Sequence, residues 1–132
     1  LAYAQARRVQ SLARHWFAQF FQQYDLLLLP TTPIPAPPIT LGQAPVSEAP
    51  GQTPQIPAAV LRAAQLTRFT APFNLTGLPA ISVPCGWVVE GGAVLPVGLQ
   101  IVGRLWDERR VLQAAYAFEQ TGQAAMRFSA PA

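Results

Sequence analysis

One stretch, residues 70–86, constrains the local structure more strongly than any other part of the chain. It reads Thr-Ala-Pro-Phe-Asn-Leu-Thr-Gly-Leu-Pro-Ala-Ile-Ser-Val-Pro-Cys-Gly. Pro72 lacks a backbone donor and disturbs the last turns of a helix, Gly77 can adopt the positive φ of a helix C-cap, and Pro79 cannot continue a helix. The apolar run 80–83 that follows is short. The stretch therefore predicts the end of a helix, a tight corner and a short buried strand.

Short polar side chains surround this corner, at Thr70, Asn74 and Thr76. A corner at a strand end that is rich in small polar groups is where α/β folds often build binding pockets. The same groups can instead cap the helix and satisfy its backbone. Considered without any other information, these residues favour the structural role.

Residues 1–24 carry apolar side chains at helical spacing. The repeat of three and four residues predicts a helix with an aromatic stripe packed in the core, rather than a partner-binding face. The members of the stripe are Val9, Leu12, Ala13, Trp16, Phe17, Phe20 and Tyr24. His15 is the only histidine and has no other ligand type at metal-binding spacing, so we expect no metal site.

Residues 25–57 predict a strand followed by a proline-rich loop. The run 26–29 is four leucines, which suits a strand buried on both faces, as in a largely parallel sheet. The density of proline from 30 to 57 excludes ordinary helix and central strand. We expect an extended loop that covers part of the fold; a ligand for a proline-binding module is the alternative.

Residues 58–122 predict a core of helix, strand, hairpin and helix, and 123–132 form a tail. Pro57 suits the first position of a helix that runs to about Phe69. The sequence Glu-Gly-Gly at 90–92 predicts a hairpin turn, and Asp107 is a good N-cap for the last helix. The order of elements predicts one α/β segment with a mixed sheet of three or four strands covered by helices.

Composition limits the partners of the chain. Only 11% of the residues are charged against 51% hydrophobic, so we expect an apolar face that packs against something else. The net charge of +3 comes from scattered arginines, which gives no nucleic-acid footprint. No apolar run reaches membrane-spanning length. Cys85 is the only cysteine, which fits a reducing cytoplasm.

Three segments in the same order as in a known family carry a resemblance. The corner reads Thr70-x-Pro-x-Asn-x-x-Gly-x-Pro-x-x-x-x-Pro-x-Gly86. It is preceded by Tyr24-Asp-Leu-Leu-Leu-Leu-Pro-Thr-Thr-Pro33 and followed by Leu95-Pro-Val-Gly-Leu-Gln-Ile-Val-Gly103. Together these segments, with Asp-Glu opening a helix at 107, resemble the C-terminal part of the amidase signature family. The resemblance covers most of residues 24–120 and implies the C-terminal part of that fold, in an enzyme that hydrolyses a carboxamide to a carboxylate and ammonia or an amine, without a cofactor.

The resemblance places the family's reactive groups outside this chain. The family uses two serines and a lysine, in which the lysine activates a weak alcohol through a bridging serine. This chain has no lysine, and its four serines are isolated from one another: Ser11, Ser47, Ser82 and Ser129. The chain begins at Leu1, within a helical pattern. We therefore assign no catalytic residue and expect an inactive fragment whose partner is the missing N-terminal part of the same enzyme. Its apolar face also predicts self-association.

Thr31, Thr70 and Asn74 are the expected substrate-binding residues, because the resemblance places them at strand and helix ends that face a small-molecule amide substrate. Thr32 is a weaker candidate. Cys85 has no base near it in the sequence, so we interpret it as a small buried residue in a turn rather than a nucleophile.

Two alternatives stay open. One is the A subunit of a tRNA-dependent glutamine amidotransferase, which belongs to the same family. That subunit carries an acidic residue shortly before the corner, where this chain has Thr67, and this difference favours a general amidase. The other alternative is a non-catalytic interaction module.

Overall fold

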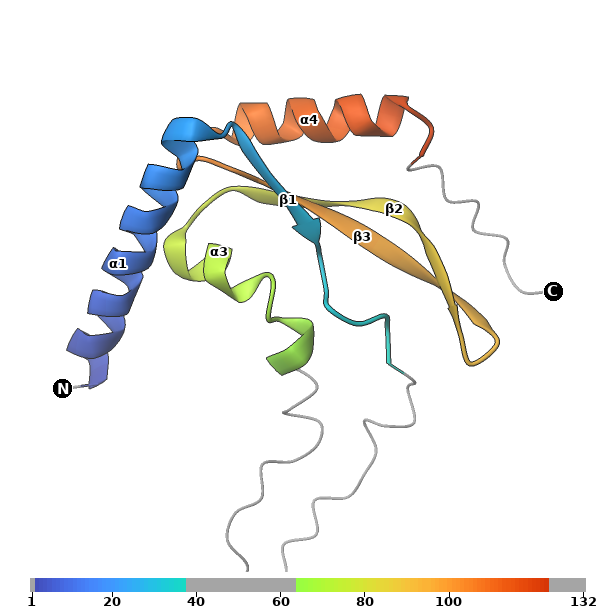
Figure 1. Cartoon of the computed structure of the whole chain (residues 1–132), viewed down its shortest axis with the longest axis horizontal. Coiled ribbons are helices and arrows are strands. Elements are labelled where there is room, and N and C mark those ends of the chain that lie inside the picture. Colours follow the sequence, from blue (N-terminus) through green and yellow to red (C-terminus); the bar gives the residue numbers. More distant parts are fainter. Residues whose placement is uncertain (1, 38–63, 124–132) are drawn as a thin grey trace, which may run out of the picture.

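The computed structural model describes residues 2–37 and 64–123. Its elements follow the order helix, strand, helix, strand, strand, helix (Figure 1): α1 Ala2–Gln23, β1 Leu26–Pro30, α3 Ala71–Thr76, β2 Ala80–Glu90, β3 Ala93–Gly103 and α4 Glu108–Gln120. Residues 64–66 are helical as well. Most of the predicted proline-rich loop, the first part of the helix predicted from Pro57 and most of the tail lie outside the described residues.

The three described strands form one antiparallel sheet in the order β1-β3-β2. Ile101 of the middle strand β3 pairs with Leu28 of β1 on one side and with Ile81 of β2 on the other. The α/β class is confirmed. The described pairs are all antiparallel, where we expected a mixed sheet, because β2 and β3 are joined directly by a hairpin and β1 runs antiparallel to β3.

Helices cover both faces of this sheet (Figure 1). On one face α1 and α3 pack around the buried side chains of Phe21, Phe73 and Val102. On the other face α4 covers Val83 and Ile101 through its own Ala115 and neighbouring side chains. The consecutive residues Ile101 and Val102 of β3 thus pack on opposite faces of the sheet, as the alternation of side chains along a strand requires.

The apolar stripe of α1 is largely not core, contrary to prediction. Phe21, which we did not include in the stripe, is the buried residue of this helix. Phe17 and Phe20 pack against it, whereas Trp16 is 74% exposed. The stripe is wider than the contact that α1 makes with α3 and the sheet, so much of it faces away from the described part of the chain. This exposed apolar side agrees with the low charge of the sequence.

The strand β1 forms where four leucines predicted it, but it is not buried on both faces. Among the described strands it lies at an edge of the sheet. Leu27 and Leu29 point into the layer of α1 and α3. Leu28 points to the opposite face and is 58% exposed, because α4 lies mainly against β2 and β3.

The corner differs from prediction in how its helix is built. Pro72 lies in the first turn of a new six-residue helix, α3, rather than in the last turns of a longer one. Proline is tolerated there because its missing N–H would have no intrahelical partner. Gly77 is the predicted C-cap: its φ is 77° and its N–H donates to the carbonyl of Phe73 at 2.8 Å.

The strand after the corner is eleven residues long instead of four, since β2 continues through Pro84 to Glu90. The strand accommodates Pro84 through a β-bulge. Pro84 pairs with Gly98 and Gly86 pairs with Val97, so Cys85 between them has no opposite residue on β3. A bulge of this kind lets a strand bend without ending.

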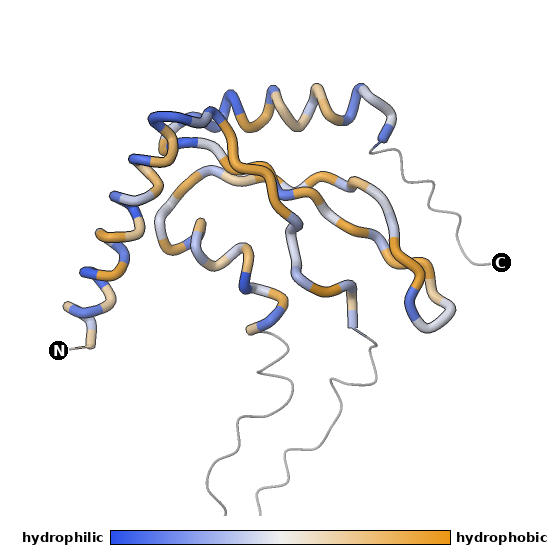
Figure 2. The backbone as a smooth tube through the Cα atoms, in the orientation of Figure 1, coloured by the Kyte–Doolittle hydropathy of each residue, from blue (hydrophilic) through white to orange (hydrophobic). Residues whose placement is uncertain are grey.

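The hairpin turn forms at Gly91 and Gly92, as predicted. Their φ values of 58° and 81° match a primed two-residue turn, which suits the twist of the flanking strands. Figure 2 shows hydrophobic residues along both strands of this hairpin and hydrophilic ones near its turn. Trp87 is among the exposed apolar residues of the hairpin.

Asp107 precedes α4 as predicted, but its side chain does not cap the helix. Its carboxylate instead pairs with Arg110 at 3.1 Å and Arg104 at 3.5 Å. Both arginines also contact Asp25, which stands between α1 and β1. These four side chains tie the start of α4 to the start of β1.

In residues 2–37 and 64–123, none of the helices has the length and hydrophobicity that crossing a lipid bilayer requires.

Candidate functional site

Thr31, a predicted binding residue, lies directly after β1 and continues its pairing with β3. Its N–H donates to the carbonyl of Gly98 at 2.8 Å. Its hydroxyl oxygen lies 2.5 Å from the hydroxyl oxygen of Ser82 on β2, so one of the two donates to the other. Thr31 is half-buried and Ser82 is exposed, which leaves the hydroxyl pair within reach of a ligand.

A hollow of about 320 Å³ opens beside this hydroxyl pair. Its lining combines three hydroxyl side chains with two prolines and two small apolar residues: Thr31, Thr32, Ser82, Pro84, Pro96, Val97 and Gly98. The hydroxyl of Thr32 donates to the carbonyl of Ile34 at 2.8 Å. The hollow lies at the bulge of β2, and bulges are common next to active sites because they re-aim side chains.

Gly98 makes the hydroxyl pair possible. A Cβ atom at this position would lie 2.7 Å from the hydroxyl oxygens of both Thr31 and Ser82. Such a separation is shorter than real contacts allow, so a side chain at Gly98 would push the two hydroxyls apart. Glycine in a strand often marks a place where another group approaches the backbone closely.

Thr70 and Asn74 do not join Thr31. The hydroxyl of Thr70 donates to the carbonyl of Thr67 at 3.2 Å, and its own carbonyl accepts the N–H groups of Phe73 and Asn74. This bonding agrees with a structural role in starting α3. Asn74 is exposed; its backbone N–H is bonded to Thr70, but its side-chain amide forms no hydrogen bond with another residue of the described part. Among those residues no side-chain hydrogen bond joins any two of the three predicted binding residues.

Gln100 is a buried polar residue that sequence reasoning missed. It lies on the central strand β3 and is 4% exposed. Its side-chain amide donates to the carbonyl of Phe69 at 3.0 Å, so it fixes the turn that leads to Thr70. The signal was present in the sequence as a single polar residue between Leu99 and Ile101, on a strand that carries otherwise apolar or small side chains.

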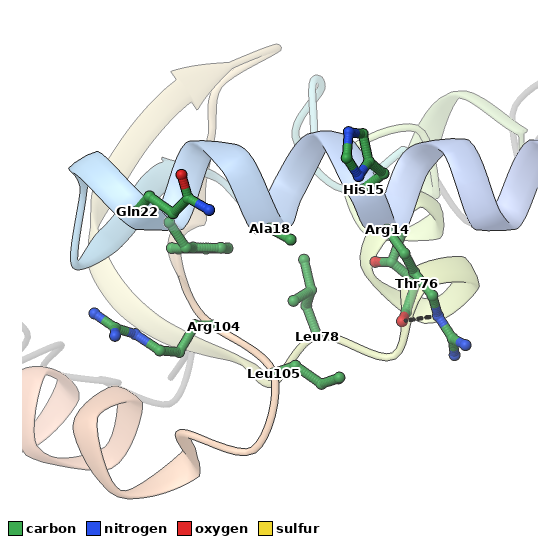
Figure 3. A pocket seen from close by; sticks show the side chains of 9 residues that line it. Arg14, His15, Ala18, Gln22, Thr76, Leu78, Arg104 and Leu105 are labelled. Atoms are coloured by element: carbon green, nitrogen blue, oxygen red, sulfur yellow. Dashed lines mark hydrogen bonds between the residues drawn. The ribbon is translucent and has the colours of Figure 1, made fainter.

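A second hollow, of about 510 Å³, lies between α1, the end of α3 and the segment after β3 (Figure 3). Arg14 crosses from α1 and donates to the carbonyl of Thr76 at 2.8 Å. Arg104, on the opposite side, is engaged by Asp25 and Asp107. Both arginines therefore have structural partners.

A third hollow, of about 570 Å³, runs along the exposed side of α1 beside Trp16 and is mainly apolar.

The described part holds no nucleophile beside a base. Cys85 is exposed in the bulge of β2, not buried in a turn as predicted, because β2 continues through that position. Its thiol contacts the carbonyl of Val97 at 3.6 Å. No group of three or more metal-ligating side chains gathers within residues 2–37 and 64–123.

Known proteins match this chain over most of its length. A model of the Amidase family matches residues 1–112. The A subunit of glutamyl-tRNA(Gln) amidotransferase from Geobacillus thermodenitrificans is 42% identical over 118 residues, which are 89% of this chain and 21% of the relative. The chain thus spans about a fifth of the length of the curated relatives that it matches.

Two solved structures share the fold. The A subunit of glutamyl-tRNA(Gln) amidotransferase from Thermotoga maritima matches with a TM-score of 0.67 and 33% identity, over 89% of this chain and 22% of that protein. The 6-aminohexanoate cyclic dimer hydrolase in complex with its substrate matches with a TM-score of 0.60 and 28% identity, over 93% of this chain and 23% of that protein. The resemblance drawn from three sequence segments is confirmed: the chain belongs to the Amidase family.

Proposed function

We propose that this chain is the C-terminal part of an enzyme that hydrolyses a carboxamide C–N bond to a carboxylate and ammonia or an amine. The observation that supports this most directly is the family match over residues 1–112, combined with a hollow beside the Thr31 and Ser82 hydroxyls whose lining residues include no base. Hydrolysis of an amide needs a nucleophile, a base and donors for the developing oxyanion. The chain would supply the wall that binds the substrate, and the preceding part would supply the chemistry.

The proposed chemistry uses a Ser-Ser-Lys triad located outside this chain. The sequence has no lysine, and the hydroxyl of Ser82 has a threonine, Thr31, as its partner rather than a base. A threonine hydroxyl cannot take up a proton as a general base at neutral pH. We therefore keep the expectation that the 132-residue chain alone is inactive and that its first partner is the preceding part of the same polypeptide.

A second candidate is the A subunit of a tRNA-dependent glutamine amidotransferase. Its support is the 42% identity to the Geobacillus protein. Against it stands Thr67, which occupies the place where the resemblance leads us to expect an acidic residue. Such a residue would bind the amino group of glutamine by charge, which a threonine hydroxyl does not do.

The two candidates are separated by assaying the full-length protein. Release of ammonia from simple neutral amides, without glutamyl-tRNA(Gln), would support the hydrolase. Amide transfer onto glutamyl-tRNA(Gln) from glutamine, with no release from other amides, would support the amidotransferase. In either case, replacing the lysine of the preceding part should abolish turnover.

Thr31 remains the best-supported of the predicted binding residues, because it lines a hollow. Thr70 and Asn74 remain proposals for the substrate-facing wall of the complete enzyme. We further propose a cytoplasmic enzyme that needs no cofactor. The exposed apolar sides of α1 and of the hairpin would drive self-association of the isolated chain.

A further inference from the structure

The hollow of about 510 Å³ between α1, the end of α3 and the segment after β3, here called the Arg14 hollow, has mainly apolar walls (Figure 3). Ala18, Phe21, Leu78 and Leu105 supply these walls, and no aspartate or glutamate is among the lining residues. Its volume falls within the range of roughly 300–1,000 Å³ that is typical of small-molecule sites. The hollow therefore suits a ligand with an apolar body.

Arg14 adds a positive charge at one end of this hollow. Its Nε donates to the carbonyl of Thr76 at 2.8 Å, which holds the side chain in place. A guanidinium carries five N–H donors, so this bond leaves its two terminal amino groups able to donate to the two oxygens of a carboxylate. Among the described residues, no carboxylate lies within ion-pair distance of Arg14. The guanidinium is thus fixed in position while its charge is not balanced by this part of the chain.

Arg104, at the opposite end of the hollow, differs from Arg14 because Asp25 and Asp107 balance its charge. The apolar side chains lie between the two arginines (Figure 3). A ligand with an anionic head and an apolar tail matches this arrangement, with the head at Arg14. A small inorganic anion would leave the apolar walls uncovered, and a neutral compound would not use the charge.

The Arg14 hollow lies at the opposite end of β1 from Thr31. Arg104 follows Gly103, which pairs with Leu26 at the start of β1, whereas Thr31 follows Pro30 at its end. The length of this strand separates the two places by roughly 15 Å, and no residue lines both hollows. A small ligand in the Arg14 hollow is therefore too far from the hydroxyl pair to contact it.

We infer that the Arg14 hollow binds a small organic carboxylate, with its carboxylate on the guanidinium of Arg14 and its apolar tail along Ala18, Leu78 and Leu105. The inference does not depend on the proposed function, because it uses none of the residues that were assigned to the substrate.

The test uses straight-chain carboxylates of increasing length and a neutral alcohol. Calorimetry measures the binding of butanoate, hexanoate, octanoate and 1-hexanol to the full-length protein. We expect Kd to fall along the series of acids, by up to about fourfold for each methylene that the apolar walls bury. Hexanoate should bind more tightly than 1-hexanol, which has no charge to offer Arg14.

Substitutions of Arg14 test the charged end of the site. Arg14→Gln should weaken octanoate binding by about tenfold, the effect of losing a hydrogen bond between charged groups. Arg14→Lys keeps the charge and should lose less. The matched control is Arg8→Gln, which removes another exposed arginine of α1 that does not line the hollow; it should leave Kd unchanged.

A second pair of variants tests the apolar part without touching the bond from Arg14 to Thr76. Ala18→Phe places a large side chain into the hollow from an exposed position of α1 and should abolish octanoate binding. Ala4→Phe, at an exposed position of the same helix outside the hollow, should not. Melting temperatures of all variants show that each is folded under the conditions of the assay.

Three results would overturn the inference. The first is a full-length protein that does not bind octanoate, as when another part of the polypeptide or a second copy covers the hollow. The second is an unchanged Kd in both Arg14→Gln and Ala18→Phe. The third is a loss of binding in Ser82→Ala alone, which would place the carboxylate beside Thr31 instead.

Discussion

The hydroxyl oxygens of Thr31 and Ser82 lie 2.5 Å apart, although 51 positions separate the two residues in the sequence. Ser82 belongs to one outer strand of the described sheet, Thr31 directly follows the other, and the two meet over Gly98 of the central strand. Their contact therefore depends on two strand pairings at once. It places a hydrogen-bonding group at the edge of a hollow that the rest of the fold leaves open.

Gly98→Ala and Gly103→Ala form a matched pair that separates packing from binding. A Cβ at Gly98 would meet the two hydroxyls at 2.7 Å, and one at Gly103 would meet Val111 at 2.6 Å. Both substitutions overpack the protein, and we expect each to lower its free energy of unfolding by about 1–3 kcal/mol. Urea unfolding of the full-length protein measures this loss. Only Gly98→Ala should also raise KM for an amide substrate; an equal rise for Gly103→Ala would contradict the role given to the hollow.

Gln100→Leu should destabilise the protein although it places an apolar residue in a buried position. The substitution leaves the carbonyl of Phe69 without its donor, at an expected cost of about 1–3 kcal/mol in the free energy of unfolding. The control is Gln113→Leu on the exposed side of α4, which should change stability by less than about 0.5 kcal/mol. Equal urea midpoints for the two variants would show that the hydrogen bond from Gln100 to Phe69 contributes nothing to stability.

Much of the chain could be predicted from local signals. Four leucines marked β1, two adjacent glycines marked the hairpin turn, and Gly77 marked the end of α3, because each depends on the conformation of one or two residues. The strand predicted from the run 80–83 was too short, because β2 continues through Pro84 to Glu90. A proline does block a ladder bond, but the bulge at Cys85 that accommodates it depends on the partner strand.

Contacts between elements lay beyond what the sequence could predict. Helical spacing identified the apolar stripe of α1, yet it carries no information on which part of the stripe a neighbour covers, so Trp16 was expected inside and Phe21 was overlooked. Ser82 was interpreted as isolated because its partner is distant in the sequence. Thr31 was selected as a residue at a strand end and lies beside a hollow, whereas Thr70 and Asn74 do not line that hollow.

Gly77→Ala should weaken the corner because Gly77 adopts a φ of 77°. An L-residue in this left-handed region costs about 1–2 kcal/mol, so we expect a lower thermal midpoint of the full-length protein. Gly77→Asn should lose less, since asparagine tolerates this conformation better. The prediction would be wrong if alanine and asparagine had the same effect.

Asn74→Ala should change activity more than stability. The side-chain amide of Asn74 forms no hydrogen bond with the rest of the described part, and the residue is exposed, so little of the folding energy of this segment depends on that side chain. The measurement is KM and kcat of the full-length protein for an amide, beside its melting temperature. A large fall in melting temperature with unchanged activity would identify Asn74 as a structural residue.

The central claim is that these 132 residues bind substrate while the reacting groups belong to the preceding part of the polypeptide. Its most direct test is ammonia release from a neutral amide, measured in parallel for the full-length protein and for the purified 132-residue chain. We expect turnover by the full-length protein and none by the chain alone. Turnover by the chain alone that persists through further purification would contradict the claim.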